Sequence, residues 1–303
     1  MLRHLATAAL TTAALTTTVL TTAAVLTPAG AAHAADPVHY VALGDSYTAG
    51  PLTSFLQPGA PIGCIRGDLN YPTLIAKKLK PASFEDVSCS GAKTTHMAGP
   101  QSFSVGRPNP PQLNALTTQT TLVTLTLGGN DMGFSKAMKC FQVAAQNPEG
   151  SPCKDQLTQD GTDPFEEGVT RSAPKVGEVL QAIRDRAPHA RVLLLTYPLV
   201  LPQGPGCYPW VPIAAGDAPF LLGAELRLNA MLLDQAGRHE VEVVDTTEPG
   251  HDMCQGDPAK RWIEGVPLQW AAPAHPNQQG ERAMAELTLK VLGVVRSESR
   301  SAS

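Results

Sequence analysis

Five short runs rich in Val, Leu and Thr constrain the fold of this chain more than any other sequence feature. Most of them are almost continuously apolar, as strands covered on both faces of a sheet are. The runs are His39 to Leu43, Phe84 to Val87, Leu122 to Leu127, Arg191 to Thr196 and Val241 to Val244. They predict five strands of a parallel sheet.

Helical patterns lie between these runs. Apolar residues recur at helical spacing from Val176 to Ile183, from Leu222 to Leu233 and from Met284 to Val294. Asn70 followed by Tyr71 and Pro72 predicts a further helix start, because Asn caps helices and Pro is tolerated in the first turn. The alternation of strand and helix predicts an α/β fold of three layers.

The first 34 residues have the composition of a secretory signal peptide. Arg3 precedes a stretch of Ala, Leu, Thr and Val that ends in the small residues Ala32-His33-Ala34. Because Thr interrupts the stretch repeatedly, we expect cleavage near Ala34 or Ala35 rather than a membrane anchor. The sequence therefore predicts a secreted, extracellular protein. Residues 35–296 would form a single domain and residues 297–303 a frayed tail.

Charge excludes nucleic acid as a partner. The chain has 23 Lys and Arg against 27 Asp and Glu, and loss of Arg3 with the signal peptide leaves 22 − 27 = −5. Proteins that bind nucleic acid need clustered positive charge. We expect a monomer.

Six cysteines lie in the exported part, where an oxidising compartment lets an even number pair. They predict three disulfides, although the residues alone allow fifteen pairings. The chain has no C-x-x-C pair and no His cluster at ligand spacing, so we expect no metal and no cofactor.

Four polar segments follow the predicted strands or precede the last helix. They are Gly44-Asp45-Ser46 after the first run, Cys89-Ser90-Gly91-Ala92 after the second, Gly128-Gly129-Asn130-Asp131 after the third, and His275-Pro276-Asn277. Because ligands bind at the carboxyl edge of parallel sheets, these segments are expected to meet there. A serine hydroxyl needs a base such as imidazole to act as a nucleophile, which Ser46 and His275 would supply.

Together the four segments resemble the conserved blocks of the GDSL/SGNH hydrolases, and the surrounding sequence resembles their secreted actinomycete lipases and esterases. The resemblance implies a flavodoxin-like SGNH fold with a five-stranded parallel sheet. It implies Ser46 as nucleophile and His275 as general base, with an oxyanion hole formed by the Ser46 and Gly91 N–H groups and the Asn130 amide. It also implies sequential disulfides: Cys64–Cys89, Cys140–Cys153 and Cys207–Cys254.

One position departs from the family pattern. The family usually carries Asp three residues before the histidine, and this chain has Ala272 there. Such a carboxylate would hold the Nδ1 proton of the imidazole. We expect a backbone carbonyl of Ala272 or Trp270 to replace it, with the carboxylates of Asp252, Asp257 and Glu264 as alternatives.

The expected activity is hydrolysis of a carboxylic ester, with a lipid or another acyl ester as substrate. A phospholipase A or a carbohydrate acetylesterase would use the same machinery, since the four segments do not specify the acyl pocket. A catalytically inactive secreted binding protein is a further alternative, because the usual Asp is missing.

Overall fold

A single parallel sheet organises the chain. The computed structural model describes residues 37–265 and 271–294, so the expected signal peptide and frayed tail lie outside the described residues. The strands are β1 (His39–Gly44), β2 (Ser83–Asp86), β3 (Leu122–Thr126), β4 (Arg191–Leu195) and β5 (Glu242–Val244), and they pair in the order β2-β1-β3-β4-β5. This five-stranded, all-parallel arrangement confirms the predicted α/β fold.

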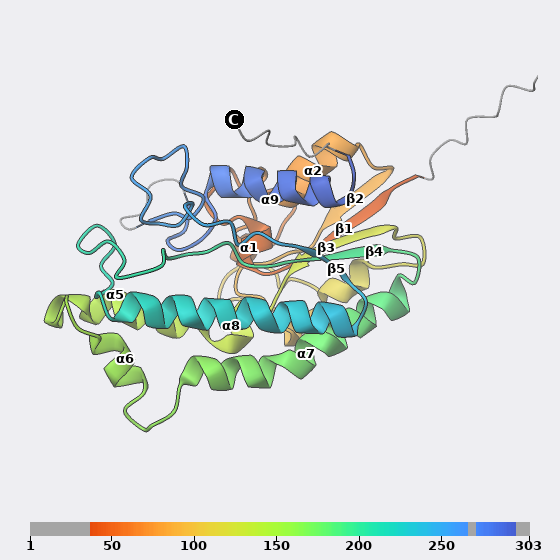
Figure 1. Cartoon of the computed structure of the whole chain (residues 1–303). Coiled ribbons are helices and arrows are strands. Elements are labelled where there is room, and N and C mark those ends of the chain that lie inside the picture. Colours follow the sequence, from red (N-terminus) through yellow and green to blue (C-terminus); the bar gives the residue numbers. More distant parts are fainter. Residues whose placement is uncertain (1–36, 266–270, 295–303) are drawn as a thin grey trace, which may run out of the picture. The chain divides into compact units, whose positions relative to one another are not determined.

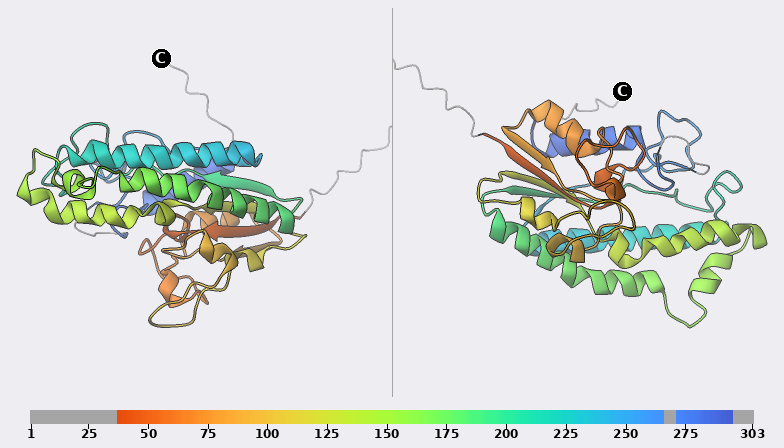
Figure 2. Two further views of the ribbon diagram at one scale, coloured as in Figure 1. Left: turned by 90° about the horizontal axis from the view of Figure 1, so that it is seen from below. Right: turned by 180° about the vertical axis from the view of Figure 1, so that it is seen from behind.

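Four long helices cover the two faces of the sheet (Figure 1). Helices α2 (Tyr71–Leu79) and α9 (Gln278–Val291) pack on one face, where Tyr40 and Ala42 of β1 are buried. Helices α7 (Pro164–Arg186) and α8 (Asp217–Arg238) lie side by side on the other, against Val41 and Leu43 (Figure 2). Successive residues of a strand point to opposite faces, which explains why the central strands are apolar throughout.

Three of the four long helices, α2, α7 and α9, start with a side-chain cap, because the first N–H groups of a helix lack partners within it. Asn70 accepts from the Thr73 N–H at 3.2 Å, so α2 begins where the sequence predicted. Asp163 caps α7 in the same way, and Asn277 caps α9 through the N–H groups of Gln279 and Gly280.

Short helices fill the loops. The α-helices are α1 (Ser46–Ala49), α3 (Thr95–Ala98), α4 (Gly129–Met132), α5 (Met138–Val143) and α6 (Pro152–Leu157), and the 3₁₀ turns are η1 (Ile62–Cys64), η2 (Gln112–Ala115), η3 (Phe134–Ala137) and η4 (Ala144–Gln146). Two of them follow adjacent strands, α1 after β1 and α4 after β3. Strand order reverses at this point, which is where open α/β sheets bind ligands.

Three disulfides join the loops, in the sequential pairing that the resemblance implied. Cys64–Cys89 connects the loops after β1 and β2, and Cys207–Cys254 connects those after β4 and β5. Cys140–Cys153 links α5 to α6. Within the described ranges, no helix is long and apolar enough to span a membrane.

Candidate active site

The turn from β1 into α1 places Ser46 at the carboxyl edge of the sheet. Asp45 caps α1 by accepting from the Tyr47 N–H at 3.0 Å. Gly44 has φ 130°, and a Cβ there would lie 2.4 Å from Thr48 Oγ1 and 2.6 Å from the Thr126 carbonyl oxygen. Only glycine fits this turn, which brings the serine hydroxyl to the end of the strand.

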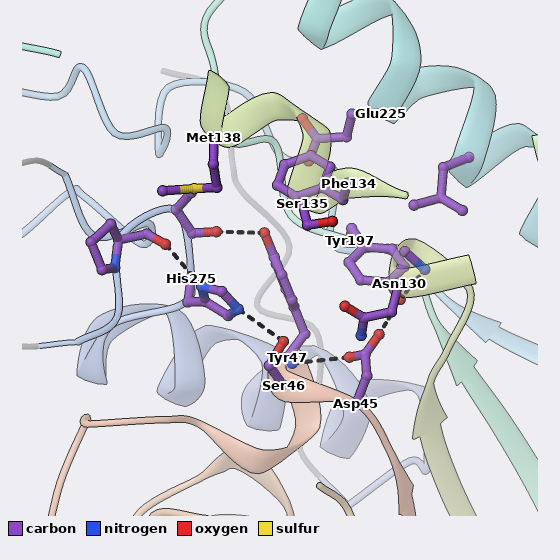
Figure 3. A pocket seen from close by; sticks show the side chains of 14 residues that line it. Asp45, Ser46, Tyr47, Asn130, Phe134, Ser135, Met138, Tyr197, Glu225 and His275 are labelled. Carbon is purple, nitrogen blue, oxygen red and sulfur yellow. Dashed lines mark hydrogen bonds between the residues drawn. The ribbon is translucent and has the colours of Figure 1, made fainter. Parts of the chain in front are cut away.

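The imidazole of His275 lies beside that hydroxyl (Figure 3). Its Nε2 is 2.8 Å from Ser46 Oγ, and its Nδ1 is 2.9 Å from the Pro273 carbonyl oxygen. Nδ1 therefore donates to the carbonyl, and the unprotonated Nε2 can accept the serine proton. Burial lowers the pKa of His275, and the Pro273 carbonyl opposes this only in part. The net effect favours the neutral form of the imidazole that faces Ser46.

The group that holds Nδ1 of His275 differs from the one expected from the sequence. A backbone carbonyl does hold the ring, but it belongs to Pro273 and not to Ala272, whose carbonyl accepts from the backbone N–H of His275 at 3.2 Å. Trp270 lies outside the described residues. The cause is Ala274, which adopts a left-handed conformation with φ 58° and so turns the preceding carbonyl toward the ring.

The three alternative carboxylates are engaged elsewhere. Asp252 accepts from the Cys254 N–H at 2.9 Å, and Asp257 accepts from the Ala259 N–H at 3.0 Å. Glu264 pairs with Arg261 at 3.6 Å. Nδ1 of His275 faces Pro273 and none of these groups.

Two buried tyrosines connect the loops around Ser46. The Tyr47 hydroxyl donates to the Ala274 carbonyl at 2.7 Å, so the residue after Ser46 holds the turn before His275. The Tyr197 hydroxyl donates to Asp45 at 2.5 Å and accepts from the Gly129 N–H at 3.0 Å. Burial raises the pKa of Asp45 to about 6, although the hydrogen bonds that Asp45 accepts from Tyr197, the Tyr47 N–H and Thr126 favour its charged form.

Of the three predicted oxyanion donors, Ser46 and Asn130 line the pocket and Gly91 does not. Asn130 lines the same pocket as Ser46, and its Nδ2 donates one hydrogen bond to the Ala92 carbonyl at 3.0 Å. In Figure 3, Ser46 lies between His275 and Asn130. Gly91 adjoins Ala92 in an exposed turn with φ 76° and does not line this pocket. Across the described residues, the N–H groups of Ser46 and Gly91 have no protein acceptor.

A largely apolar pocket of about 190 Å³ opens at Ser46. Phe134, Met138 and Leu228 line it. Two carboxyl groups also line it: Asp45 lies beside Ser46, and Glu225 lies on the opposite wall (Figure 3). Glu225 accepts from the Val200 N–H at 3.0 Å, and burial raises its pKa to about 8. The carboxyl group is therefore neutral at pH 7, and this wall carries no charge.

Sequence reasoning did not assign Tyr47, Glu225, Phe134 or Met138 to the site. Tyr47 adjoins Ser46 in sequence, which was the one available signal. Glu225 lies on α8, Phe134 in η3 and Met138 in α5, and no sequence pattern in these segments indicates that they line a pocket. Within the described ranges, no three His, Cys, Asp or Glu side chains are grouped so that they could hold a metal ion.

Comparison with known proteins agrees with this geometry. The sequence profile of the GDSL-like lipase/acylhydrolase family matches residues 42–283, a range that contains the Ser46 turn, Asn130 and His275. The chain belongs to this family. As a GDSL-family lipase/esterase, the enzyme hydrolyses carboxylic esters.

Individual relatives come from Streptomyces. Lipase 2 of Streptomyces coelicolor is 41% identical over 276 residues, which cover 88% of this chain and 90% of that protein. Among solved structures, an extracellular lipase of Streptomyces rimosus matches with a TM-score of 0.68 at 26% identity, and a phospholipase A1 of Streptomyces albidoflavus with 0.69 at 27%. Each alignment covers 84% of this chain and 99% of the solved one.

Proposed function

We propose that the enzyme cleaves its ester through an acyl-enzyme on Ser46, with His275 as general base. The observation that carries the proposal is the 2.8 Å contact between Ser46 Oγ and His275 Nε2, with Nδ1 held by a carbonyl. The hydroxyl attacks the ester carbonyl while Nε2 takes its proton. The imidazolium then protonates the leaving alcohol, and water, activated by the same nitrogen, releases the acid.

The tetrahedral oxyanion would be bound by the Ser46 N–H, the Gly91 N–H and the Asn130 amide. Two features support these roles: both N–H groups lack an acceptor among the described residues, and Nδ2 of Asn130 has a second hydrogen beyond the one given to Ala92. Donors of this kind stabilise the charge that develops in the transition state.

The substrate that fits the pocket best is a lipid acyl ester such as a triacylglycerol. Its apolar lining suits a hydrocarbon chain, and the neutral Glu225 adds no charge there. A phospholipase A is the second candidate, because the similar Streptomyces albidoflavus structure is a phospholipase A1. Rates on triacylglycerol and on phosphatidylcholine presented in the same mixed micelles would separate the two.

Residues 1–34 would be removed as a signal peptide, and residues 35–296 would act outside the cell as one monomeric domain, followed by the tail of residues 297–303. Three disulfides support secretion, because they persist in oxidising compartments. Amino-terminal sequencing of the secreted protein would locate the cleavage site.

The nucleophile is tested by Ser46→Ala. The variant should lose essentially all hydrolysis of a nitrophenyl ester while it keeps the melting temperature of the wild type, because one hydroxyl contributes little to stability. A phosphonate probe should label Ser46 in the wild type. Labelling of a different serine, or full activity in the variant, would falsify this assignment.

A further inference from the structure

Two loops beside the active site expose large apolar side chains. In loop 51–67, Phe55 is 86% exposed and Ile62 58%, and in loop 101–107 Val105 is 73% exposed. The loops pack together, since Gly63 abuts the Phe103 ring and Ile62 approaches Gly106. We call the exposed set the apolar patch: Leu52, Phe55, Leu56, Ile62, Ile65 and Val105. Single exposed apolar residues are common in proteins, but several on two loops that pack together indicate an interaction surface.

Loop 51–67 reverses the usual distribution of polar and apolar side chains. Its one charged residue, Arg66, is only 5% exposed, and its guanidinium donates to the Ser88 carbonyl at 2.7 Å and pairs with Asp86 at 3.6 Å. Burying a charge is costly unless it is paired in this way. The loop thus buries its guanidinium and leaves the Phe55 ring in solvent.

The exposure is fixed by the backbone. Leu52 and Ile65 adopt the left-handed region, with φ 63° and 49°, which branched side chains rarely occupy. Such conformations persist only where the surroundings impose them. Here the Cys64–Cys89 disulfide and the bridge between Leu56 and Gly67 hold the loop.

The patch borders the catalytic histidine. The Pro51 carbonyl accepts from the Ala272 N–H at 3.2 Å, three residues before His275, and the Thr53 carbonyl accepts from Gln278 at 2.7 Å. Residues 50–67 and 87–130 contain no Asp or Glu, although the chain has 27. The exposed cations there are Lys93 and Arg107. This surface therefore does not repel the anionic head groups of a lipid surface.

We propose that the apolar patch docks the enzyme onto the surface of aggregated lipid, with its side chains among the acyl chains and the His275 loop at the interface. The inference rests on the proposed action on lipid esters. A lipid surface fits better than a second copy of the chain. Lipid conforms to separate side chains that protrude from two curved loops, whereas a protein partner needs a complementary shape.

Binding is tested without hydrolysis in the Ser46→Ala protein. Phe55→Ser, Ile62→Ser and Val105→Ser, combined in that background, should lower partition onto phosphatidylcholine–phosphatidylglycerol vesicles at least tenfold in a sedimentation assay. The matched control replaces Leu226 and Leu233 by Ser, since these residues are 46% and 49% exposed on α8, and should leave partition unchanged. Equal partition of the triple variant and its parent would overturn the proposal.

Activity gives an independent test in the enzyme with Ser46 intact. The triple variant should hydrolyse dissolved nitrophenyl acetate within twofold of the wild-type rate. On an emulsified triacylglycerol it should lose at least tenfold in rate. An equal loss on both substrates would mean that the patch supports the fold or pocket, which also overturns the proposal. The proposal would also be overturned if the wild type is a dimer, and the triple variant is a monomer that binds vesicles as well as the wild type does. Failure of the ester-hydrolase mechanism would instead appear as activity in Ser46→Ala.

Discussion

At the residue scale, His275 combines a backbone acceptor with partial burial. A carboxylate partner would stabilise the imidazolium by its charge, whereas the Pro273 carbonyl offers only a dipole. The neutral form of the ring is the form that acts as a base. The environment of His275 therefore lowers the pKa of the ring, which stays unprotonated at a pH where a free imidazole would be protonated.

The pH dependence of kcat/KM follows from this burial. If His275 is the general base as proposed, activity requires the unprotonated ring, so kcat/KM rises as pH rises through the pKa of His275. Because burial lowers that pKa, the midpoint of the acid limb should lie below the ~6.5 of free imidazole. Asp45, whose pKa is about 6, titrates in the same interval, so the His275 ring should be followed directly by NMR. A midpoint above 7 would indicate a charged partner for the ring.

The alternative carboxylates should be dispensable for catalysis. Asp252→Asn, Asp257→Asn and Glu264→Gln should each keep kcat within about tenfold, because none of them holds His275. Loss of a true triad carboxylate costs on the order of 10⁴ in kcat. A loss of that size in one folded variant, judged by its circular dichroism, would identify a triad.

The Tyr47 hydroxyl should affect kcat, because it holds the turn before His275. Tyr47→Phe removes its bond to the Ala274 carbonyl and loosens the strained turn that aims Pro273 at His275. We expect kcat to fall by about tenfold with KM nearly unchanged, because orientation of the base would suffer. The control is Tyr40→Phe, which deletes a buried hydroxyl bonded to Thr124 at 2.7 Å near the start of β1. Equal kinetic effects of the two variants would reduce the role of Tyr47 to stability.

At the scale of elements, the β1–α1 connection depends on Gly44. An added Cβ would meet backbone and side-chain atoms in a left-handed conformation, so Gly44→Ala should lower the free energy of unfolding by about 2 kcal/mol or more and reduce kcat. Gly237→Ala is the matched control, since it lies in α8 with no atom near the added Cβ. That change should stabilise the protein by up to about 1 kcal/mol. Denaturant titration of both variants checks the contrast.

At the scale of the whole molecule, the disulfides close loops of different length. Their sequence separations of 25, 13 and 47 residues correspond to about 3.5, 3 and 4 kcal/mol in the chain-entropy treatment. Replacement of each pair by Ser should therefore destabilise the protein most at Cys207–Cys254 and least at Cys140–Cys153, as measured by thermal unfolding. Loss of Cys64–Cys89 should also reduce activity before unfolding, because Cys89 lies two residues from Gly91. Full activity in that variant would argue against Gly91 as an oxyanion donor.

The sequence by itself determined the features that are local or periodic. Apolar runs and helical spacing predicted the parallel sheet, because strand and helix periods are properties of neighbouring residues. Polar segments at strand ends predicted which residues meet, because parallel strands end at one edge. Ser46, Asn130 and His275 do lie in one pocket as expected.

Only the tertiary structure decided the contacts between distant segments. The bond between Tyr47 and Ala274 joins residues 227 positions apart, and the choice of Pro273 over Ala272 depends on a left-handed alanine that no propensity favours. The apolar patch is equally hidden in the sequence, where nothing distinguishes Phe55 and Ile62 from core residues. Whether a side chain is buried depends on which other segments cover it, and a sequence pattern does not contain that information for an irregular loop.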